Sequence, residues 1–316
     1  MTFFNQSLAI ELLTIAQISE FFPINVSGAT LKGKPLRADQ TKRFIGRNGN
    51  SDTEGYTSVS EDGDIVVAFR SSETQFFKPS GALRDWFLTD LRSNRMLYPP
   101  EPGKWPNHTW VHTGFWLAYN VVRDNIQAEV SRLIMESPPP AIRRIYATGF
   151  SLGGPLAFLA SIDLGLLDIP VELYTFAGPR AGDSSLNQLM RSRTDASHIV
   201  VYGCDPVPRL PPVGPDLPLT LHKIAVIEIG PANLGGIVVP QVGQEYETPD
   251  RIAYLDGNGH LANALPLGPN IELNFAHHNY TRYDAAIRAI LPSELGPPPK
   301  PGPKVDVAAL THMLRS

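Results

Sequence analysis

The chain has very little cysteine. Cys204 is the only one among 316 residues, so no disulfide can form within the chain, and folding does not require an oxidising compartment. Because the sequence also shows no Cys/His cluster with metal-ligand spacing, we expect neither a metal ion nor a cofactor.

An excess of basic residues and long apolar runs are also absent. The 27 Lys and Arg residues are outnumbered by 31 Asp and Glu residues, and the formal net charge is −4 at pH 7. This balance gives no electrostatic reason to expect nucleic acid or an anionic membrane surface as a partner. No run approaches the roughly 20 apolar residues that a membrane-spanning helix needs, so we expect no membrane span.

The N-terminal segment SLAIELLTIAQISEFF lacks the pattern of a secretory signal. Glu11 interrupts its apolar run, and the first basic residue is Lys32, whereas a signal peptide begins with a basic region. Up to Pro23 its apolar residues recur at helical spacing: Leu8, Leu12, Ile15 and Phe22. We therefore expect an amphipathic packing helix that Pro23 stops, in a protein that is cytoplasmic or exported by an unrecognised route.

Strand-like and helix-like segments alternate along the rest of the chain. Strands are expected at 55–69 (a hairpin), 109–112, 142–150, 171–178, 198–204 and 221–229, and helices at 115–133, 153–167, 184–193 and 283–291. This alternation predicts an α/β fold with a mainly parallel central sheet and helices on both faces. We expect one domain over 1–291, with 230–275 as an excursion outside the core elements, and a Pro-rich C-terminal tail over 292–316.

The segment YATGFSLGGPLAF fits the pattern G-x-S-x-G at residues 149–153, between a predicted strand and a predicted helix. A sharp strand-to-helix turn would expose the Ser151 hydroxyl, and the start of the helix would supply N–H groups for developing negative charge. The alternative is a small serine in a tight turn. The strand–turn–helix context favours a nucleophile.

A nucleophilic serine needs a base, and the base needs an orienting carboxylate. Asp205 ends a predicted strand and is the best acid, although an aspartate before Pro206 also suits a simple turn. Asp163 and Asp168, in or just after the helix that follows the serine, suit surface or capping roles better. Among the histidines that follow Asp205, the neighbours His277 and His278 precede the last predicted helix, and spacing alone does not separate them.

Seven segments in order resemble the class 3 lipases, the fungal-type branch of the α/β-hydrolases. They are IVVAFRSSET, LRDWFLTDL, VHTGFWLAY, GFSLGG, YTFAGPRAGD, DPVPRLPP and LTLHKIAVIEI. The resemblance implies the α/β-hydrolase fold, with Ser151 as nucleophile and Asp205 as acid. The family's histidine usually precedes an aromatic residue by about five positions, and His278 with Tyr283 fits this better than His277, which then becomes a packing or supporting residue.

The resemblance also implies an oxyanion hole and a lid. The N–H groups of Leu152 and Ser72 would form the oxyanion hole. Residues 73–92 are the lid candidate, with a fixed loop as the alternative, and its apolar side chains would face an acyl groove or a lipid–water interface: Phe76, Phe77, Trp86, Phe87 and Leu88.

Two positions depart from the family pattern. Phe150 stands where the family commonly has histidine, and we expect it to change packing at the elbow without removing the triad. Ser71 replaces the glycine of F-R-G, where a side chain could narrow the acyl entrance or redirect the loop that aims the Ser72 N–H.

The function implied is serine-dependent hydrolysis of carboxylic esters, by a triacylglycerol lipase or esterase that forms an acyl-enzyme. The same triad would also serve a phospholipase, a feruloyl esterase or an acyltransferase. The alternative of another class is a catalytically silent hydrolase fold used for binding. The expected partner is a lipid or other ester substrate, with transient contact at a lipid–water interface if the lid moves.

Overall fold

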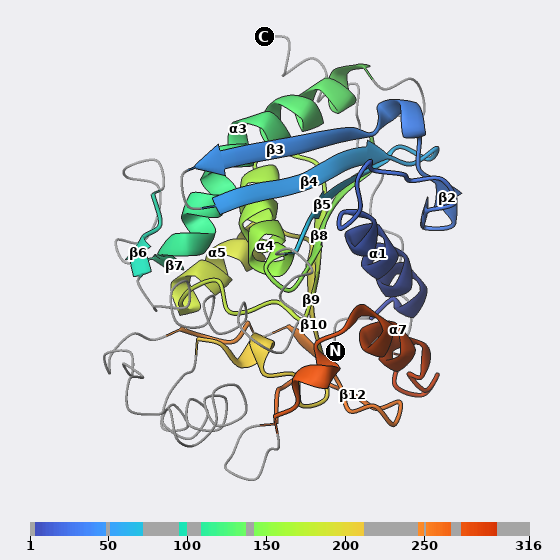
Figure 1. Cartoon of the computed structure of the whole chain (residues 1–316), viewed down its shortest axis with the longest axis vertical. Coiled ribbons are helices and arrows are strands. Elements are labelled where there is room, and N and C mark those ends of the chain that lie inside the picture. Colours follow the sequence, from blue (N-terminus) through green and yellow to red (C-terminus); the bar gives the residue numbers. More distant parts are fainter. Residues whose placement is uncertain are drawn as a thin grey trace.

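The computed structural model describes residues 4–48, 51–71, 95–99, 109–136, 142–211, 246–249, 251–266 and 273–295. A single large sheet dominates this part of the chain (Figure 1). Its eight strands follow the spatial order β12-β11-β10-β9-β8-β5-β4-β3. The five central strands from β5 to β11 run parallel to one another, and the pairs at both edges are antiparallel. The predicted mainly parallel sheet is confirmed.

The strands of the large sheet are β3 (Lys42–Asn48), β4 (Ser51–Val59), β5 (Asp64–Phe69), β8 (Arg144–Phe150), β9 (Val171–Phe176), β10 (Ala196–Tyr202), β11 (Ile252–Leu255) and β12 (Leu261–Ala262). Two small hairpins pair β1 (Thr30–Leu31) with β2 (Lys34–Pro35) and β6 (Arg95–Leu97) with β7 (Trp110–His112). The helices are α1 (Gln6–Ile18), α3 (Thr113–Glu136), α4 (Gly153–Leu164), α5 (Ser184–Arg193) and α7 (Tyr280–Arg288).

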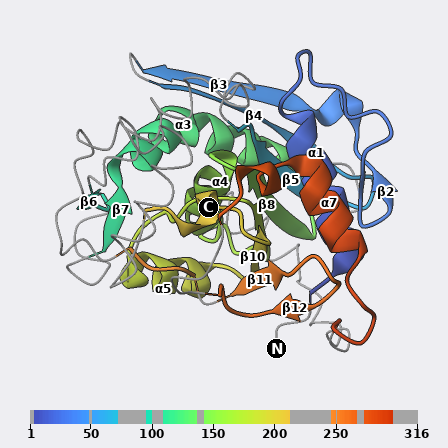
Figure 2. The same cartoon turned by 60° about the horizontal axis from the view of Figure 1, so that its bottom comes forward.

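Helices cover both faces of the sheet. On one face, α3, α4 and α5 pack over an apolar core that includes Val67, Ile145 and Leu173. On the other face, α1 and α7 lie side by side over a second core that includes Tyr146 and Phe176 (Figures 1 and 2). Successive side chains of a strand point to opposite faces, so each central strand supplies both cores.

The central elements are apolar because they are covered on both sides. Every residue of β5 is buried, as expected for a strand inside a parallel sheet. Every residue of α4 is buried as well, which is typical of a helix that lies between a sheet and other helices. Because α4 follows β8 directly, this packing fixes the turn between them, where Ser151 lies.

The N-terminal helix is shorter than the apolar pattern predicts. Asn5 caps α1 by accepting a hydrogen bond from the Leu8 N–H, and the helix ends at Ile18. Leu8, Leu12 and Ile15 are buried, whereas Phe22 lies beyond the helix and is 46% exposed. The prediction that Phe22 packs on the same helix face is therefore wrong, because the helix ends at Ile18 and Phe22 lies outside it.

The expectation that all of 230–275 lies outside the core is also wrong. Strand β11 pairs in parallel with β10, and Ile252, Ala253 and Leu255 are buried. The predicted strand at 221–229 and most of the tail at 292–316 lie outside the described residues, and the division into domain and tail stays a prediction. Within the described part of the chain, no helix is both long and apolar enough to cross a membrane.

Candidate active site

Ser151 lies on the sharp turn between β8 and α4, with φ of 52°. Few residues other than glycine adopt this left-handed conformation, and here packing on both sides holds it. A methyl group at Gly149 would overlap the Gly153 backbone, and one at Gly153 would come within 2.5 Å of the Phe69 carbonyl oxygen. The glycines of G-x-S-x-G are therefore required by the close approach of β8, α4 and the end of β5.

The three candidate residues Ser151, Asp205 and His278 come together at the carboxyl ends of the parallel strands. His278 Nε2 lies 2.9 Å from Ser151 Oγ, and His278 Nδ1 lies 2.9 Å from Asp205 Oδ2. Because the carboxylate can only accept, Nδ1 carries the proton and Nε2 is the acceptor for the serine hydroxyl. The arrangement has the geometry for general-base activation of the serine.

Asp205 is completely buried, and several donors satisfy its carboxylate. Tyr283 donates its hydroxyl to Oδ2 at 2.7 Å, and the Val207 N–H donates to Oδ1 at 2.9 Å. Burial raises the pKa of Tyr283 well above its usual value, so this hydroxyl is a neutral donor. The spacing of Tyr283 from His278 favours this histidine in the family pattern, and in the structure the tyrosine bonds the same carboxylate as His278.

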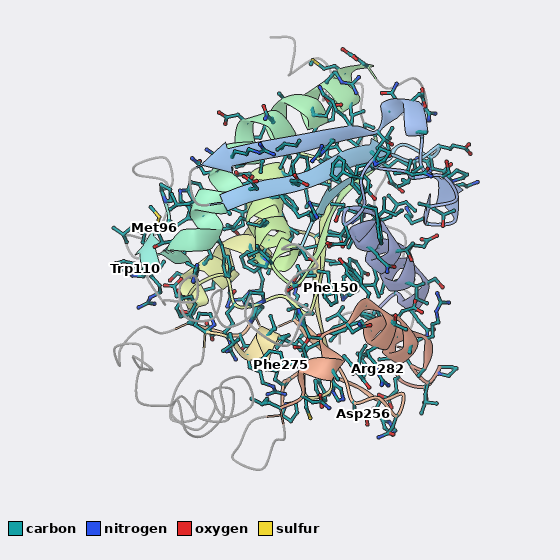
Figure 3. The ribbon with its side chains drawn as sticks, in the orientation of Figure 1. Met96, Trp110, Phe150, Asp256, Phe275 and Arg282 are labelled. Atoms are coloured by element: carbon teal, nitrogen blue, oxygen red, sulfur yellow. The ribbon has the colours of Figure 1, made fainter. Side chains whose placement is uncertain are left out.

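The two neighbouring histidines have different partners. His278 is buried and bonds Asp205, whereas His277 is half-buried and its Nδ1 accepts the Cys204 N–H at 3.0 Å. His278 follows the short 3-10 helix η6 (Phe275–His277), and Asn279 caps α7 immediately after it. This change of backbone direction sends the two side chains to different neighbours. Figure 3 labels Phe275 at the start of this segment and Phe150 at the end of β8.

Phe150 fills the interior beside the proposed base. It is completely buried, its ring stacks on Tyr280 at a centroid distance of 4.0 Å, and it lies 5.1 Å from the His278 ring. The expectation that Phe150 changes elbow packing fits this position, since the ring supports His278 from the side and takes no part in the hydrogen-bond chain.

Ser71 is held in the interior by a glutamate that the sequence did not single out. Its N–H donates to Glu20 Oε1 at 2.9 Å, and Tyr280 donates its hydroxyl to the same oxygen at 2.8 Å. Ser71 is buried, and its side chain shares a hydrogen bond with Tyr280. Glu20 thus ties the end of β5 to the residues around His278, and nothing in its sequence context marks this role.

The expected oxyanion hole is only partly described. Leu152 is the N-cap residue of α4, at the end of the helix where backbone N–H groups lack an acceptor within the helix. Ser72 and all five lid candidates, Phe76, Phe77, Trp86, Phe87 and Leu88, lie outside the described residues. The Ser72 donor and the lid therefore stay predictions.

The rejected acid Asp163 is not a surface residue. It is 5% exposed and accepts hydrogen bonds from Tyr119 Oη at 2.7 Å and Arg123 Nε at 2.6 Å. The surface or capping role expected for it is wrong, because α4 is buried on all sides. Asp168 is exposed in the turn after α4, as expected. Neither residue contacts His278.

The described ranges offer no cluster of metal-ligating side chains. No group of three or more His, Cys, Asp or Glu side chains there is arranged to hold a metal ion. Cys204, next to Asp205, is a free thiol of intermediate burial.

Comparisons with known proteins agree with this architecture. The family model "Lipase (class 3)" matches residues 66–214. A secreted mono- and diacylglycerol lipase 1 of Fusarium solani is 40% identical over 103 residues, which cover 33% of this chain and 30% of that protein. A lipase of Rhizomucor miehei is 32% identical over 165 residues, which cover 50% of this chain and 43% of that protein.

The matched region thus spans less than half the length of these two curated relatives. The solved structure of the native Rhizomucor miehei lipase propeptide complex superimposes with a TM-score of 0.56 at 20% identity, over 86% of this chain and 78% of that one. This likeness supports the α/β-hydrolase fold. The family match runs across β5, β8, α4 and the Asp205 turn, so this part of the chain is similar to the class 3 lipases.

Proposed function

We propose that the chain is a serine-dependent carboxylic ester hydrolase that acts on acylglycerols through an acyl-enzyme. The observation that carries this proposal is the hydrogen-bond chain from Ser151 Oγ through His278 to Asp205, with 2.9 Å at each step. A binding protein would have no need for a strained serine, a base and a buried acid in line, which argues against a silent fold.

The first half of the reaction acylates the serine. His278 Nε2 takes the proton of Ser151 Oγ as the oxygen attacks the acyl carbonyl carbon, and Asp205 stabilises the imidazolium. The carbonyl oxygen becomes negative and would be held by the Leu152 N–H at the positive end of α4. His278 then gives the proton to the leaving alcohol as the ester bond breaks.

The second half removes the acyl group. Water enters, His278 takes one of its protons, and the resulting hydroxide equivalent attacks the acyl carbon. The Ser151 oxygen leaves and recovers the proton from His278, which releases a carboxylic acid. The same groups therefore act twice, with no net change in the protein.

Initial hydrolysis rates on p-nitrophenyl esters from acetyl to palmitoyl, with Ser151→Ala as the paired variant, test the proposal. We expect activity in the wild type and a loss of about 10⁴-fold or more in a variant with an unchanged circular dichroism spectrum. Activity that persists in Ser151→Ala would reject the serine mechanism, and an inactive, folded wild type would favour a binding role.

The acylglycerol class rests on the relatives, since the Fusarium solani and Rhizomucor miehei proteins are named mono- and diacylglycerol lipase and lipase. Parallel rates on mono-, di- and triolein would rank these substrates. A clear preference for a phospholipid or a feruloyl ester over all three oleins would contradict this class while leaving the serine mechanism intact.

A further inference from the structure

The turn that presents Asp205 is held by a residue outside the triad. Cys204, directly before Asp205, uses both of its backbone polar groups on the segment that carries His278. Its N–H donates to His277 Nδ1 at 3.0 Å, and its carbonyl accepts the Asn274 N–H at 2.9 Å. These two hydrogen bonds therefore hold the Asp205 turn against the segment that carries His278, in addition to the direct contact between the two side chains.

The His277 ring also shapes this turn from outside. It lies 4.8 Å from the Tyr202 ring, and Gly203 has φ of +53° beneath it. A methyl group at Gly203 would come within 2.5 Å of His277 Nδ1, so the imidazole sits directly on the turn. Glycine is needed here for its conformation and for the close approach of the ring.

We propose that His277 is a positioning residue for Asp205, and that its neutral imidazole, as the acceptor of the Cys204 N–H, is the form that supports turnover. Since Nδ1 is the acceptor, the ring proton must be on Nε2. A proton on Nδ1 would remove the acceptor and loosen the turn. This inference rests on the proposed function, because it concerns the acid of that reaction.

The surroundings of His277 favour the neutral ring. Partial burial lowers the pKa of His277 below its usual value, and Arg282 on α7 acts in the same direction, while Asp205 opposes it. Tyr202, at the end of β10, and Cys204 are further titratable groups beside the ring among the described residues. The neutral form therefore dominates at neutral pH, and protonation becomes important only as the pH falls below the ordinary histidine range.

Two variants separate the acceptor from the rest of the side chain. His277→Asn keeps an oxygen near the position of Nδ1 but cannot titrate, whereas His277→Leu removes the acceptor. At pH 8 we expect His277→Leu to lower kcat about three- to tenfold, the worth of one neutral hydrogen bond, with little change in KM. His277→Asn should recover most of this loss. His260→Asn, an exposed histidine beside Glu294, is the matched control.

The pH profile tests the role of the proton. As the pH falls below the range in which an ordinary histidine titrates, the wild type loses its acceptor, so its kcat should converge on that of His277→Leu and fall below that of His277→Asn. An unchanged kcat in His277→Leu, or ratios that do not vary with pH, would overturn the proposal.

A measurement on the wild type alone tests the proposal without relying on a variant that could misfold. In long-range ¹H–¹⁵N spectra of ¹⁵N-histidine protein at pH 8, His277 should be the Nε2–H tautomer with Nδ1 unprotonated. A proton on Nδ1 would overturn the proposal whatever the activity. If the wild type hydrolyses no ester, the proposed function fails, and this spectrum still decides whether His277 holds the turn.

Discussion

Two of the buried aspartates, Asp205 and Asp163, have nearly the same surroundings and different chemistry. Each accepts a tyrosine hydroxyl at 2.7 Å, from Tyr283 and Tyr119 respectively. Each also has a nitrogen-bearing partner within 3 Å, His278 for Asp205 and Arg123 for Asp163. Burial and a tyrosine bond therefore do not distinguish an acid of an active site from a structural carboxylate.

The side chain that bonds each aspartate decides which role the aspartate has. Arg123 is permanently charged, and its bond to Asp163 raises the pKa of the guanidinium still further, so this pair only joins α3 to α4. His278 can carry a proton on either ring nitrogen, and it faces Ser151 with Nε2. A carboxylate can contribute to turnover when its partner aims a second ring nitrogen at a nucleophile.

The strongest test of this difference is to replace each aspartate by asparagine, which removes its charge. Asp205→Asn should lower kcat by about 10⁴-fold, because the amide no longer stabilises an imidazolium and favours the wrong tautomer of His278. Asp163→Asn should lower the free energy of unfolding by about 2 kcal/mol, because it weakens a buried ion pair, and should keep most of the activity. Ester hydrolysis and urea unfolding of both variants measure this. Equal losses of kcat in two folded variants would refute the distinction.

A third buried side chain, His198, extends the comparison to a group that titrates and is not part of the hydrogen-bond chain to Ser151. His198 lies between the rings of Phe4 and Tyr174, and burial lowers its pKa to about 4. The unfolded chain binds this proton more readily, so stability falls as the pH drops from about 6.5 toward 4, by about 3 kcal/mol in total. Urea unfolding at pH 7, 5.5 and 4 should show a flatter dependence in His198→Phe. The same slope in both proteins would exclude His198 as the cause.

The smallest expected effect comes from removing single hydroxyl groups. Tyr283→Phe should lower kcat about tenfold, because Asp205 loses a donor and holds His278 less firmly. Tyr119→Phe removes an equivalent bond to Asp163 and should leave kcat within about twofold. Both variants should lose about 1 kcal/mol of stability, which checks that the two bonds are matched. If the two changes lower kcat equally, the tyrosine bond has no specific role at Asp205.

The sequence predicted the elements that local pattern controls. The apolar runs of β5, β8, β9 and β10 carry their own signal because buried parallel strands need apolar side chains on both faces. The turn at Ser151 could be predicted for a related reason, because the close approach of the backbones requires the glycines that flank Ser151.

Predictions that depended on distant partners were less reliable. Strand β11 is four residues long among Gly, Pro and Asn, and it becomes a strand through pairing with β10. Asp163 looked like a surface residue because the helix that carries it gives no sign of Tyr119 and Arg123, which come from α3. Glu20 acquires its role only when α1 lies beside Ser71 and Tyr280.

The sequence by itself determined the parallel α/β core, the strained serine turn and the short list of acids and bases that could serve it. The family pattern already favoured His278 over His277, but only the tertiary structure decided which partner each of these neighbours has. The physical reason is that adjacent residues in a 3-10 turn before a helix cap point in different directions, and their contacts come from the turn after β10, about seventy residues away.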